Sequence, residues 1–468
     1  MKSPFKVIPG SIVAPKGFLA AGVFCNIKRL GTGKGSEKGR KRDLAVIVSE
    51  IPASVAGMFT TSQVCAPPVR LCIERVKKGV AQALVVNSGN ANACTGKLGM
   101  QHARAMTALL ARELHMPTDH VLVGSTGRIG VPLPLDNVKA GIRHALGLLD
   151  DTPACADQAM EAIMTSDTRP KGIAVELKLG GRTARIGGIC KGAGMIQPGM
   201  SATGARPAAR PRHATMLCFL TTDAAIEPKA LQAALNEAVA DSFNRITVDG
   251  DMSTNDTVLV LANGLAGNAP IVAADVRRLR SGDWNSGARG QKLNGASLRR
   301  LLRDAETFQL ALNYVCLELA KMIVRDGEGV SRFVTIRVTG AKSLEEADAA
   351  ARAVANSALV KTSWHGGDPN WGRIMDALGY SCATVIEERV DIGYSAPDSR
   401  KIRWSLKRGQ PSNTTFRELC AAVAPKEFDL HIQLNLGQAA GLIYAADLTE
   451  EYVAFNKGDV SDPTSLGG

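Results

Sequence analysis

CKGAGMIQP at Cys190–Pro198 and, after a Pro-, Ala- and Arg-rich segment, HATMLCF at His213–Phe219 form the most informative part of this sequence. The second stretch places a threonine after a small residue and before an apolar, strand-like run. If the Ala214–Thr215 peptide bond broke, Thr215 would begin a new chain with a free α-amine beside its hydroxyl. An α-amine has a pKa of about 8 and can therefore act as a base for that hydroxyl. The pattern predicts a self-cleaving chain with an N-terminal threonine nucleophile; taken alone, Ala-Thr-Met also fits an ordinary strand.

The overall composition is that of a soluble globular protein. At 468 residues the chain is long enough for two lobes, and 45% of its residues are hydrophobic. No apolar run reaches the roughly 18 residues that a membrane span requires. Met1–Phe5 show neither a signal-peptide pattern nor an amphipathic leader. We therefore expect a cytoplasmic protein without a membrane partner.

The charged, cysteine and histidine residues exclude several classes of protein. A net charge of +12 suggests nucleic-acid binding as an alternative. The excess charge lies in three Lys- and Arg-rich clusters within Gly-, Pro- or Ser-rich segments, without the interleaved aromatic residues of a nucleic-acid surface. The ten cysteines form no Cys-x-x-Cys pair and the seven histidines show no ligand spacing. We expect solvated basic loops, mostly buried cysteines, no metal and no nucleic-acid partner.

Apolar, β-rich runs alternate with helical patterns along the chain. The runs predict strands at Leu44–Val48, Ala83–Val86, Ile173–Leu177, Met216–Leu220, Val258–Leu261, Phe333–Val338 and Leu430–Leu436. The helical patterns predict helices at Leu98–Leu114, Lys229–Phe243, Thr307–Val324 and Ala347–Ala358. Ser343 and Glu346 have the spacing of a capping box before the last helix. This interleaving predicts an α/β or layered α+β fold.

Two polar segments, Ser201–His213 and Asn268–Gly295, interrupt the pattern and predict exposed loops. The predicted cut follows the first of them. It would divide the chain into a first part, 1–214, that ends in this loop, and a second part, 215–468, that begins with the nucleophile. The two parts must fold as one unit, because only shared packing holds them together afterwards.

Three further positions carry groups that acyl transfer needs. Val123–Gly127 follows an apolar run and predicts a flexible turn, in which the Thr126 hydroxyl and the Gly127 amide could form an oxyanion hole. Lys191 lies between a strand and two glycines that would allow a ligand to approach closely, and Asp326–Gly329 places Glu328 at a helix end. An ordinary glycine turn, a solvated lysine and a surface turn are the respective alternatives. Asp249–Thr257 is rich in carboxylates and hydroxyls, but its spacing does not fit a calcium loop.

Taken together, these segments resemble the ArgJ family, the ornithine acetyltransferases (glutamate N-acetyltransferases) of arginine biosynthesis. The resemblance runs from near residue 8 to the C-terminus. It rests on ordered motifs at Val86–Asn92, Ser125–Gly127, Met164–Thr168, Lys191–Ile196, Ala214–Leu217, Asp249–Asp251, Ser253–Thr257, Asp326–Gly329 and Asp368–Ile374. It implies a two-lobed, layered ArgJ/DmpA-like fold, comparable to N-terminal-nucleophile hydrolases but differently connected.

The resemblance also implies roles for individual residues. Thr215 matches the nucleophile and the first residue of the β chain after cleavage at Ala214–Thr215. Thr126 and Gly127 match the oxyanion hole. The substrate-binding positions of the family match Thr165, Lys191, Thr215, Glu328, Asn456 and Ser461. The family further implies an α2β2 heterotetramer.

The implied reaction moves an acetyl group from N2-acetylornithine to Thr215 and then to glutamate, which gives ornithine and N-acetylglutamate. No metal, nucleotide or redox cofactor is implied, although some family members also use acetyl-CoA as donor. We expect Lys191 to pair with the α-carboxylate that both substrates share and Glu328 to favour an amine. The sequence does not show which donor is used, or whether feedback regulation occurs.

The chain departs from the family pattern at Ser201–His213, which is inserted between Met200 and the predicted cleavage site. This insertion creates a rival Ala202–Thr203 pair and could relax strain at the scissile bond, whereas after the cut it would be a tolerated tail. Asn268–Gly295 is a second, Arg-rich departure without an assigned role. The competing functions are an aminopeptidase or amidase of the same architecture, a nucleic-acid-binding protein, and an unprocessed structural homologue.

Overall fold

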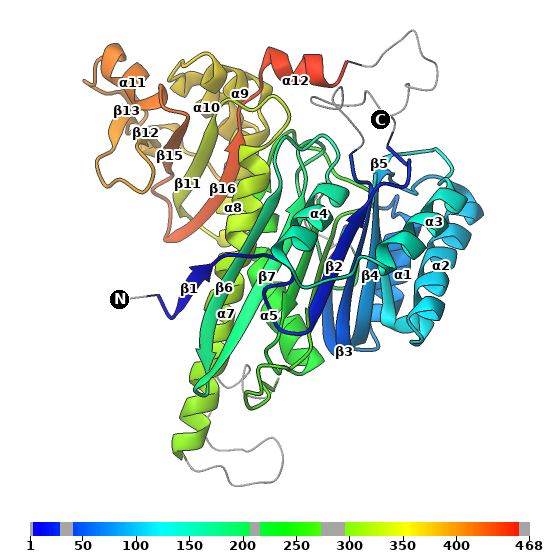
Figure 1. Cartoon of the computed structure of the whole chain (residues 1–468). Helices are drawn as coiled ribbons and strands as arrows, with labels where there is room; N and C mark the ends of the chain where they lie inside the picture. The colour runs from blue at the N-terminus through cyan, green and yellow to red at the C-terminus, as the bar shows by residue number, and fades with distance from the viewer. Residues whose placement is uncertain (1–2, 29–40, 206–215, 273–294, 458–468) are drawn as a thin grey trace.

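The computed structural model describes residues 3–28, 41–205, 216–272 and 295–457, with the backbone alone for 295–298. Within these ranges the chain forms two lobes, each built on one β-sheet (Figure 1). Ala214, Thr215 and Ser461 lie outside the described residues, as do most of the insertion before Thr215 and most of the Arg-rich segment. The predictions for these positions therefore stay predictions.

The strands have the following bounds. Those up to Ala262 are β1 (Phe5–Ile8), β2 (Phe18–Val23), β3 (Leu44–Phe59), β4 (Val80–Asn90), β5 (Val121–Arg128), β6 (Lys171–Leu179), β7 (Arg182–Lys191), β8 (Leu217–Thr222), β9 (Ile246–Thr247) and β10 (Thr257–Ala262). The later strands are β11 (Phe333–Ala341), β12 (Asp391–Ser395), β13 (Arg403–Lys407), β14 (Gln410–Pro411), β15 (Glu427–Gln433) and β16 (Ala439–Ala446).

The helices connect these strands and cover the sheets. The α-helices are α1 (Pro67–Val76), α2 (Gly96–Glu113), α3 (Leu135–Leu146), α4 (Pro153–Ile163), α5 (Pro228–Ala240), α7 (Gly295–Arg325), α8 (Leu344–Asn356), α9 (Ala358–His365), α10 (Trp371–Gly379), α11 (Phe416–Val423) and α12 (Glu450–Phe455). Short 3-10 helices occupy Thr118–His120, Phe243–Arg245 and Glu387–Arg389.

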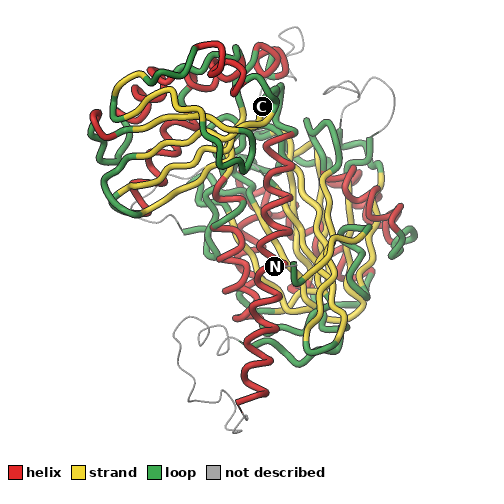
Figure 2. The backbone as a smooth tube through the Cα atoms, turned by 90° about the vertical axis from the view of Figure 1, so that its left-hand side faces the viewer, coloured by secondary structure: helices red, strands yellow, loops and turns green. Residues whose placement is uncertain are grey.

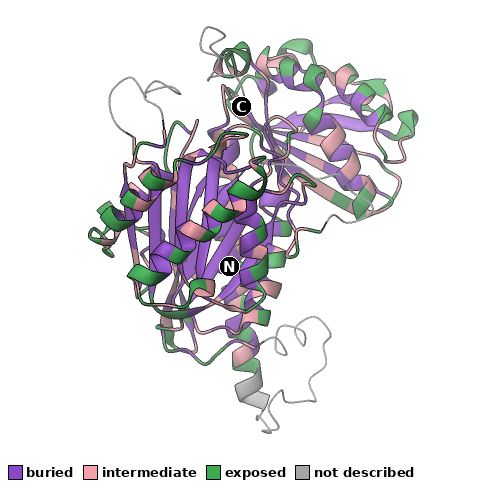
Figure 3. Cartoon of the chain, turned by 90° about the vertical axis from the view of Figure 1, so that its right-hand side faces the viewer, coloured by how far each residue is buried: buried purple, intermediate pink, exposed green. Residues whose placement is uncertain are grey.

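The larger sheet lies between two layers of helices (Figure 2). Among the described residues it has nine strands, in the order β1-β6-β7-β8-β10-β3-β4-β5 with β2 paired to β3. One face packs against α1–α4 and the other against α5 and α7. In β8, Leu217 and Phe219 belong to the first core, whereas Cys218 and Leu220 belong to the second. Because neighbouring strand residues point to opposite faces, both faces are apolar, and the strands form the buried centre of this lobe (Figure 3).

The pairing register of β8 brings three strand ends together. β8 pairs antiparallel with β7, so that its first residue, Leu217, lies opposite Lys191, the last residue of β7. On its other side β8 pairs in parallel with β10, where Leu217 lies opposite Thr257. The segment that leads into β8 therefore starts beside the Lys191 end of the sheet.

The second lobe is a smaller layered unit. Its seven described strands run in the order β14-β13-β12-β15-β11-β16-β9, and α8–α11 contribute to its core. The short strand β9 precedes β10 in the chain yet pairs in parallel with β16 of this lobe, with Tyr444 opposite Ile246. This pairing joins the two lobes by backbone hydrogen bonds.

The structure confirms the α/β class and the position of each predicted strand and helix, with shifted ends. α5 ends at Ala240 rather than Phe243, α7 begins at Gly295 rather than Thr307, and β15 ends at Gln433 rather than Leu436. The prediction of a flexible turn at Val123–Gly127 was wrong. This segment belongs to β5, which pairs in parallel with β4. The expectation of mostly buried cysteines was also wrong, since only four are buried: Cys72, Cys190, Cys218 and Cys316.

One part of α7 qualifies the expectation that no segment could span a membrane. In the described part of the chain, Arg299–Arg325 alone is long and apolar enough, by length and composition, to cross a membrane. Phe308, Leu312 and Leu319 of this helix are buried in the core beside α5. The core helix of a soluble protein passes the same test, so the helix is weak evidence for a membrane span.

We expect Gly187→Ala to destabilise the fold. Gly187 on β7 packs against the backbone near the N-terminus, and a Cβ atom there would lie 1.9 Å from the Ser11 carbonyl oxygen. Because backbone must shift to admit it, the substitution should lower the free energy of unfolding by about 1–3 kcal/mol. Thermal unfolding measures this, with Gly379→Ala as control, since a Cβ there meets nothing within 4 Å. Equal melting temperatures for the two variants would contradict this packing.

Candidate active site

A cluster of hydroxyl, ammonium and carboxylate groups lies around the Lys191 end of β7, beside the start of β8 and within reach of the Thr126 side chain of β5. Thr126 lies on β5 and Lys191 ends β7, and both are at least 98% buried. Thr165 follows the C-terminal end of α4. Three of the site residues predicted from the sequence thus lie on different elements and close together in the fold.

Lys191 joins the two threonines. Its Nζ donates to Thr165 Oγ1 at 2.7 Å and to Thr126 Oγ1 at 3.3 Å. Burial lowers the pKa of Lys191, although the nearby carboxylate of Asp167 acts in the opposite direction. A hydroxyl that accepts a hydrogen bond from an ammonium keeps its own proton free to donate, which suits Thr126 to stabilising a negative oxygen.

Asp167 organises this cluster, although no role was predicted for it from the sequence. Its Oδ1 accepts from Gly192 N at 2.7 Å and from Lys171 Nζ at 2.6 Å, and its Oδ2 accepts from Thr165 N at 2.9 Å. The same Oδ2 lies 3.9 Å from Lys191 Nζ. The available signal was its place in the motif Met164–Thr168, but the partners that reveal its role lie on β6 and after β7.

A second buried carboxylate completes the charge network. Lys171 also pairs with Asp326, which follows α7 and accepts from Thr168 N at 3.1 Å. Burial alone would raise the pKa of Asp167, but Lys171 and Lys191 hold it well below its usual range. Burial likewise opposes the charge of Lys171, and its two carboxylate partners raise its pKa above the usual value. All these charges are therefore paired inside the protein.

Gly127 occupies a position that only glycine fits. The parallel pairing of β5 with β4 places it opposite Gly89. Its φ is +126°, and an added Cβ would lie 2.4 Å from the carbonyl carbon of Gly89. The backbone amide beside Thr126 is therefore fixed in place by close strand packing.

Glu328 and Asn456 lie together beside the glycine segment that follows β7. Asn456 Nδ2 donates to Glu328 Oε2 at 2.9 Å, and Glu328 N donates to Ala193 O at 2.9 Å. A Cβ at Gly194 would lie 2.5 Å from the Glu328 carboxyl group. The structure thus brings two further predicted positions together, at the more exposed side of the same segment.

Asp249 fixes the other end of this glycine segment. Its Oδ2 accepts from Met195 N at 2.6 Å and its Oδ1 from Ile196 N at 2.8 Å. The Tyr452 hydroxyl of α12 lies 3.4 Å from the same carboxylate. Burial raises the pKa of Asp249, which the backbone donors counteract. The segment from Lys191 to Ile196 is held at both ends by carboxylates, by Asp167 at Gly192 and by Asp249 at Met195 and Ile196.

The residue that follows Thr215 is also anchored at this end of the sheet. Met216 is fully buried; its N–H donates to the Asp256 carboxylate, and its carbonyl accepts from Thr257 N at 3.0 Å. Asp256 was present in a polar segment noted in the sequence, but no role was predicted for it.

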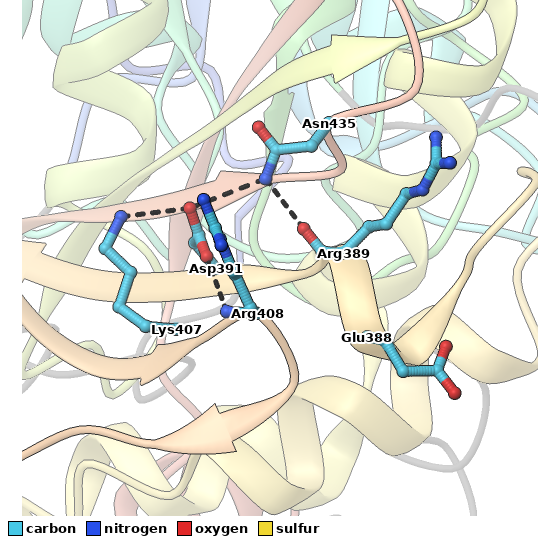
Figure 4. A pocket seen from close by; sticks show the side chains of 6 residues that line it. All are labelled: Glu388, Arg389, Asp391, Lys407, Arg408 and Asn435. Carbon is cyan, nitrogen blue, oxygen red and sulfur yellow. Dashed lines mark hydrogen bonds and ion pairs between the residues drawn. The ribbon is translucent and has the colours of Figure 1, made fainter.

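The second lobe has a surface pocket, to which β12 and β13 contribute Asp391 and Lys407 (Figure 4). It is lined by Glu388, Arg389, Asp391, Lys407, Arg408 and Asn435. Its central carboxylate, Asp391, accepts from Lys407 Nζ at 2.9 Å and from Arg408 N at 2.8 Å. The sequence predicted no functional residue among those that line it.

The comparisons with known proteins agree on one family. The ArgJ family profile matches residues 21–458. An arginine biosynthesis bifunctional protein ArgJ from Symbiobacterium thermophilum is 43% identical over 451 residues, covering 96% of this chain and 98% of that protein. A glutamate N-acetyltransferase from Methanocaldococcus jannaschii is 41% identical over 456 residues, covering 96% and 98%. The crystal structure of an ArgJ protein from Bacillus halodurans is 38% identical and covers 43% of this chain and 100% of that chain, with a TM-score of 0.40.

Lys171→Met should strongly destabilise the protein, because it leaves Asp167 and Asp326 buried without their shared cation. We expect a loss of about 3–5 kcal/mol, measured by denaturant or thermal unfolding at neutral pH. Lys6→Met is the control, since Lys6 is 68% exposed in its ion pair with Glu176 and should change stability by less than about 1 kcal/mol.

The same network predicts a pH dependence. The pKa of Asp167 is lower in the folded protein than in the unfolded chain, so its contribution is present above about pH 4 and is lost as the pH falls below that. Lys171→Met should therefore lose less stability than the unsubstituted protein on acidification. Parallel acid-unfolding curves would contradict a stabilising ion network.

Proposed function

The chain belongs to the ArgJ family, and we propose that it transfers the acetyl group of N2-acetylornithine to glutamate, giving ornithine and N-acetylglutamate. One observation carries this proposal. Lys191, Thr126 and Thr165 converge at the end of the sheet at which Met216, the neighbour of Thr215, is anchored. An acyl-transfer site needs a nucleophile and a group that stabilises the oxyanion side by side, and the convergence of these side chains near Met216 supports such a site here.

We propose that the nucleophile is created by self-cleavage between Ala214 and Thr215. The first part, 1–214, would carry the oxyanion hole and the lysine, and the second part, 215–468, would begin with Thr215. Cleavage at Ala202–Thr203 is the alternative, but it would place thirteen residues between the new amine and Met216. Met216 and Leu217 directly after the threonine favour Thr215, because they lead straight into β8.

The transfer proceeds in two steps in this proposal. The α-amine of Thr215 takes the hydroxyl proton while Oγ bonds to the acetyl carbonyl carbon of N2-acetylornithine. The carbon–nitrogen bond then breaks, and the proton passes from the ammonium to the departing ornithine amine. In the second step the glutamate amine attacks the acetyl ester, its proton returns through the α-amine to Oγ, and N-acetylglutamate leaves.

Each step develops a negative oxygen that Thr126 Oγ1 and the Gly127 amide would stabilise. Lys191, Thr165, Glu328, Asn456 and Ser461 are proposed to bind the two amino acids. The anionic α-carboxylate of the substrates suits the buried ammonium of Lys191. The substrate ammonium suits the carboxylate of Glu328, whose charge also acts on Lys191. The reaction requires no metal or redox cofactor. We further propose an α2β2 assembly in the cytoplasm.

A second candidate activity is the use of acetyl-CoA as acetyl donor. The name "bifunctional" of the Symbiobacterium relative favours it. Incubation with acetyl-CoA and glutamate, followed by detection of free thiol and N-acetylglutamate, tests this activity separately.

Two measurements on the purified protein test the main proposal. Mass spectrometry should find two chains, the second beginning with Thr215, and N2-acetylornithine should release ornithine in proportion to added glutamate. Thr215→Ala should give one uncut chain without transfer. Ornithine release that is independent of glutamate would instead indicate an amidase, and an uncut but fully active chain would refute the mechanism.

Thr126→Val should reduce kcat by about 10²- to 10³-fold, because it removes one donor to the developing oxyanion while it keeps the side-chain shape. Thr107→Val is the matched control. Thr107 is equally buried, but its hydroxyl donates within its own helix, to Arg104 O at 3.0 Å. Steady-state kinetics of both variants measures this difference in kcat. An unchanged kcat for Thr126→Val would show that Thr126 is not part of the oxyanion hole.

A further inference from the structure

Asn255 joins two strands at the point where their pairing becomes irregular. β4 and β5 pair in a parallel register that shifts directly after Gly89. Ladder hydrogen bonds are disrupted at such an irregularity, and the backbone carbonyls there need other donors. The Asn255 side chain supplies them, since its Nδ2 donates to Ser125 O of β5 at 2.9 Å and to Ala91 O, after β4, at 2.7 Å.

The amide group of Asn255 is held in one orientation. Its Nδ2 uses both hydrogens on the two carbonyls, while its Oδ1 accepts from the Thr254 hydroxyl. The backbone of this residue is fixed as well, because Asn255 N donates to Ser253 Oγ at 2.9 Å and Asn255 O accepts from Thr257 Oγ1 at 3.0 Å. The residue is 2% exposed. A buried amide whose groups are all paired is a rigid connection.

This connection fixes one side of Thr126. The carbonyl oxygen of Ser125 and the nitrogen of Thr126 belong to one planar peptide, so a bond to that oxygen orients the peptide from which Thr126 continues. On the other side, Gly127 lies opposite Gly89, and an added Cβ would lie 2.4 Å from the carbonyl carbon of Gly89. Groups outside β5 therefore fix Thr126 on both sides.

The same short segment also holds the chain that enters β8. Asp256 accepts from Met216 N, and Thr257 N donates to Met216 O at 3.0 Å. Three consecutive residues thus contact two parts of the proposed site. Asn255 contacts the strand that carries Thr126, and the next two residues contact Met216. The distance between the two parts depends on this segment.

We propose that Asn255 is a positioning residue for acetyl transfer: it holds the strand of the Thr126–Gly127 oxyanion hole in place relative to the chain that enters β8. The inference rests on the proposed function. Asn255 acts through the carbonyl of Ser125 and not on the substrate. The rate depends on such positioning, because a displacement of about 1 Å can cost about 10²-fold.

The first test is Asn255→Ala, which removes both donations to backbone carbonyls. We expect kcat to fall about 10- to 100-fold and KM to change by less than about twofold, because the affected group acts in the transition state and not in substrate binding. Rates are normalised to the amount of folded, cleaved protein, measured by circular dichroism and mass spectrometry.

A double-mutant cycle separates positioning from general support of the fold. Thr126→Val removes the side-chain donor that Asn255 is proposed to position. In the Thr126→Val background, Asn255→Ala should therefore lower kcat by at least about threefold less than it does in the unsubstituted protein.

Asn263→Ala is the matched control. Asn263 follows the opposite end of β10, is 7% exposed, and its Nδ2 also donates to a backbone carbonyl, Lys16 O at 2.9 Å, and to Ser49 Oγ at 3.3 Å. It is a buried asparagine with similar contacts, at the end of β10 that is remote from Met216. Its substitution should leave kcat within about twofold, and any effect should multiply with that of Thr126→Val.

Asn255→Asp is the second variant, which fills the same space but keeps at most one of the two donations, and we expect it to behave as Asn255→Ala does. Losses in kcat that multiply with that of Thr126→Val would overturn the proposal, since independent structural support predicts that result. An unchanged kcat, a main effect on KM, a folded variant that stays uncut, or failure of both variants to fold would also overturn it. Failure of the proposed function is distinct, because the unsubstituted protein would then transfer no acetyl group from N2-acetylornithine to glutamate.

Discussion

The burial of Lys191 at the end of β7 is the constraint on which the site depends. An ammonium is stable inside a protein only when polar partners surround it, and here two threonine hydroxyls and Asp167 do so. Asp167 in turn holds the backbone of Thr165 and of Gly192, so one carboxylate sets the position of the lysine and of both segments beside it. Through Lys171 and Asp326 the same network reaches the end of α7. The C-terminal end of α7, the start of β6 and the end of β7 are thereby held together.

The sequence predicted the class of the fold and the positions of its main strands. Runs of consecutive apolar residues indicate strands that are buried on both faces, and such runs are recognised without knowing which strands pair with them. It also named Thr126, Thr165, Lys191, Glu328 and Asn456, which the structure brings into two adjoining groups. It failed at β5, since Gly-Ser-Thr-Gly has weak strand propensity and becomes a strand only by pairing with β4, distant in the chain. It missed Asp167 and Asp256 for a related reason: the partners that reveal them, Gly192 N and Lys191 Nζ for Asp167 and Met216 N for Asp256, are distant in the chain and come near only in the fold.

The second lobe takes part in the site through short contacts. β9 crosses from the chain of the first lobe to pair with β16, and the loop after α7 carries Glu328 to the glycine segment. Asn456, at the end of α12, approaches Glu328 from the other lobe. The proposed substrate-binding groups therefore come from both lobes, whereas the groups proposed for the chemistry lie at the end of the large sheet. Specificity and acyl transfer can vary separately in such an arrangement.

β8 lies in the middle of the large sheet, hydrogen-bonded to β7 on one side and to β10 on the other. A strand at the margin of a sheet exposes unpaired amides and carbonyls that recruit other chains into aggregates. A new chain end formed just before β8 would expose no such margin, because both of its ladders are already filled. The mature protein could thus acquire a free terminus at its centre without becoming prone to aggregate.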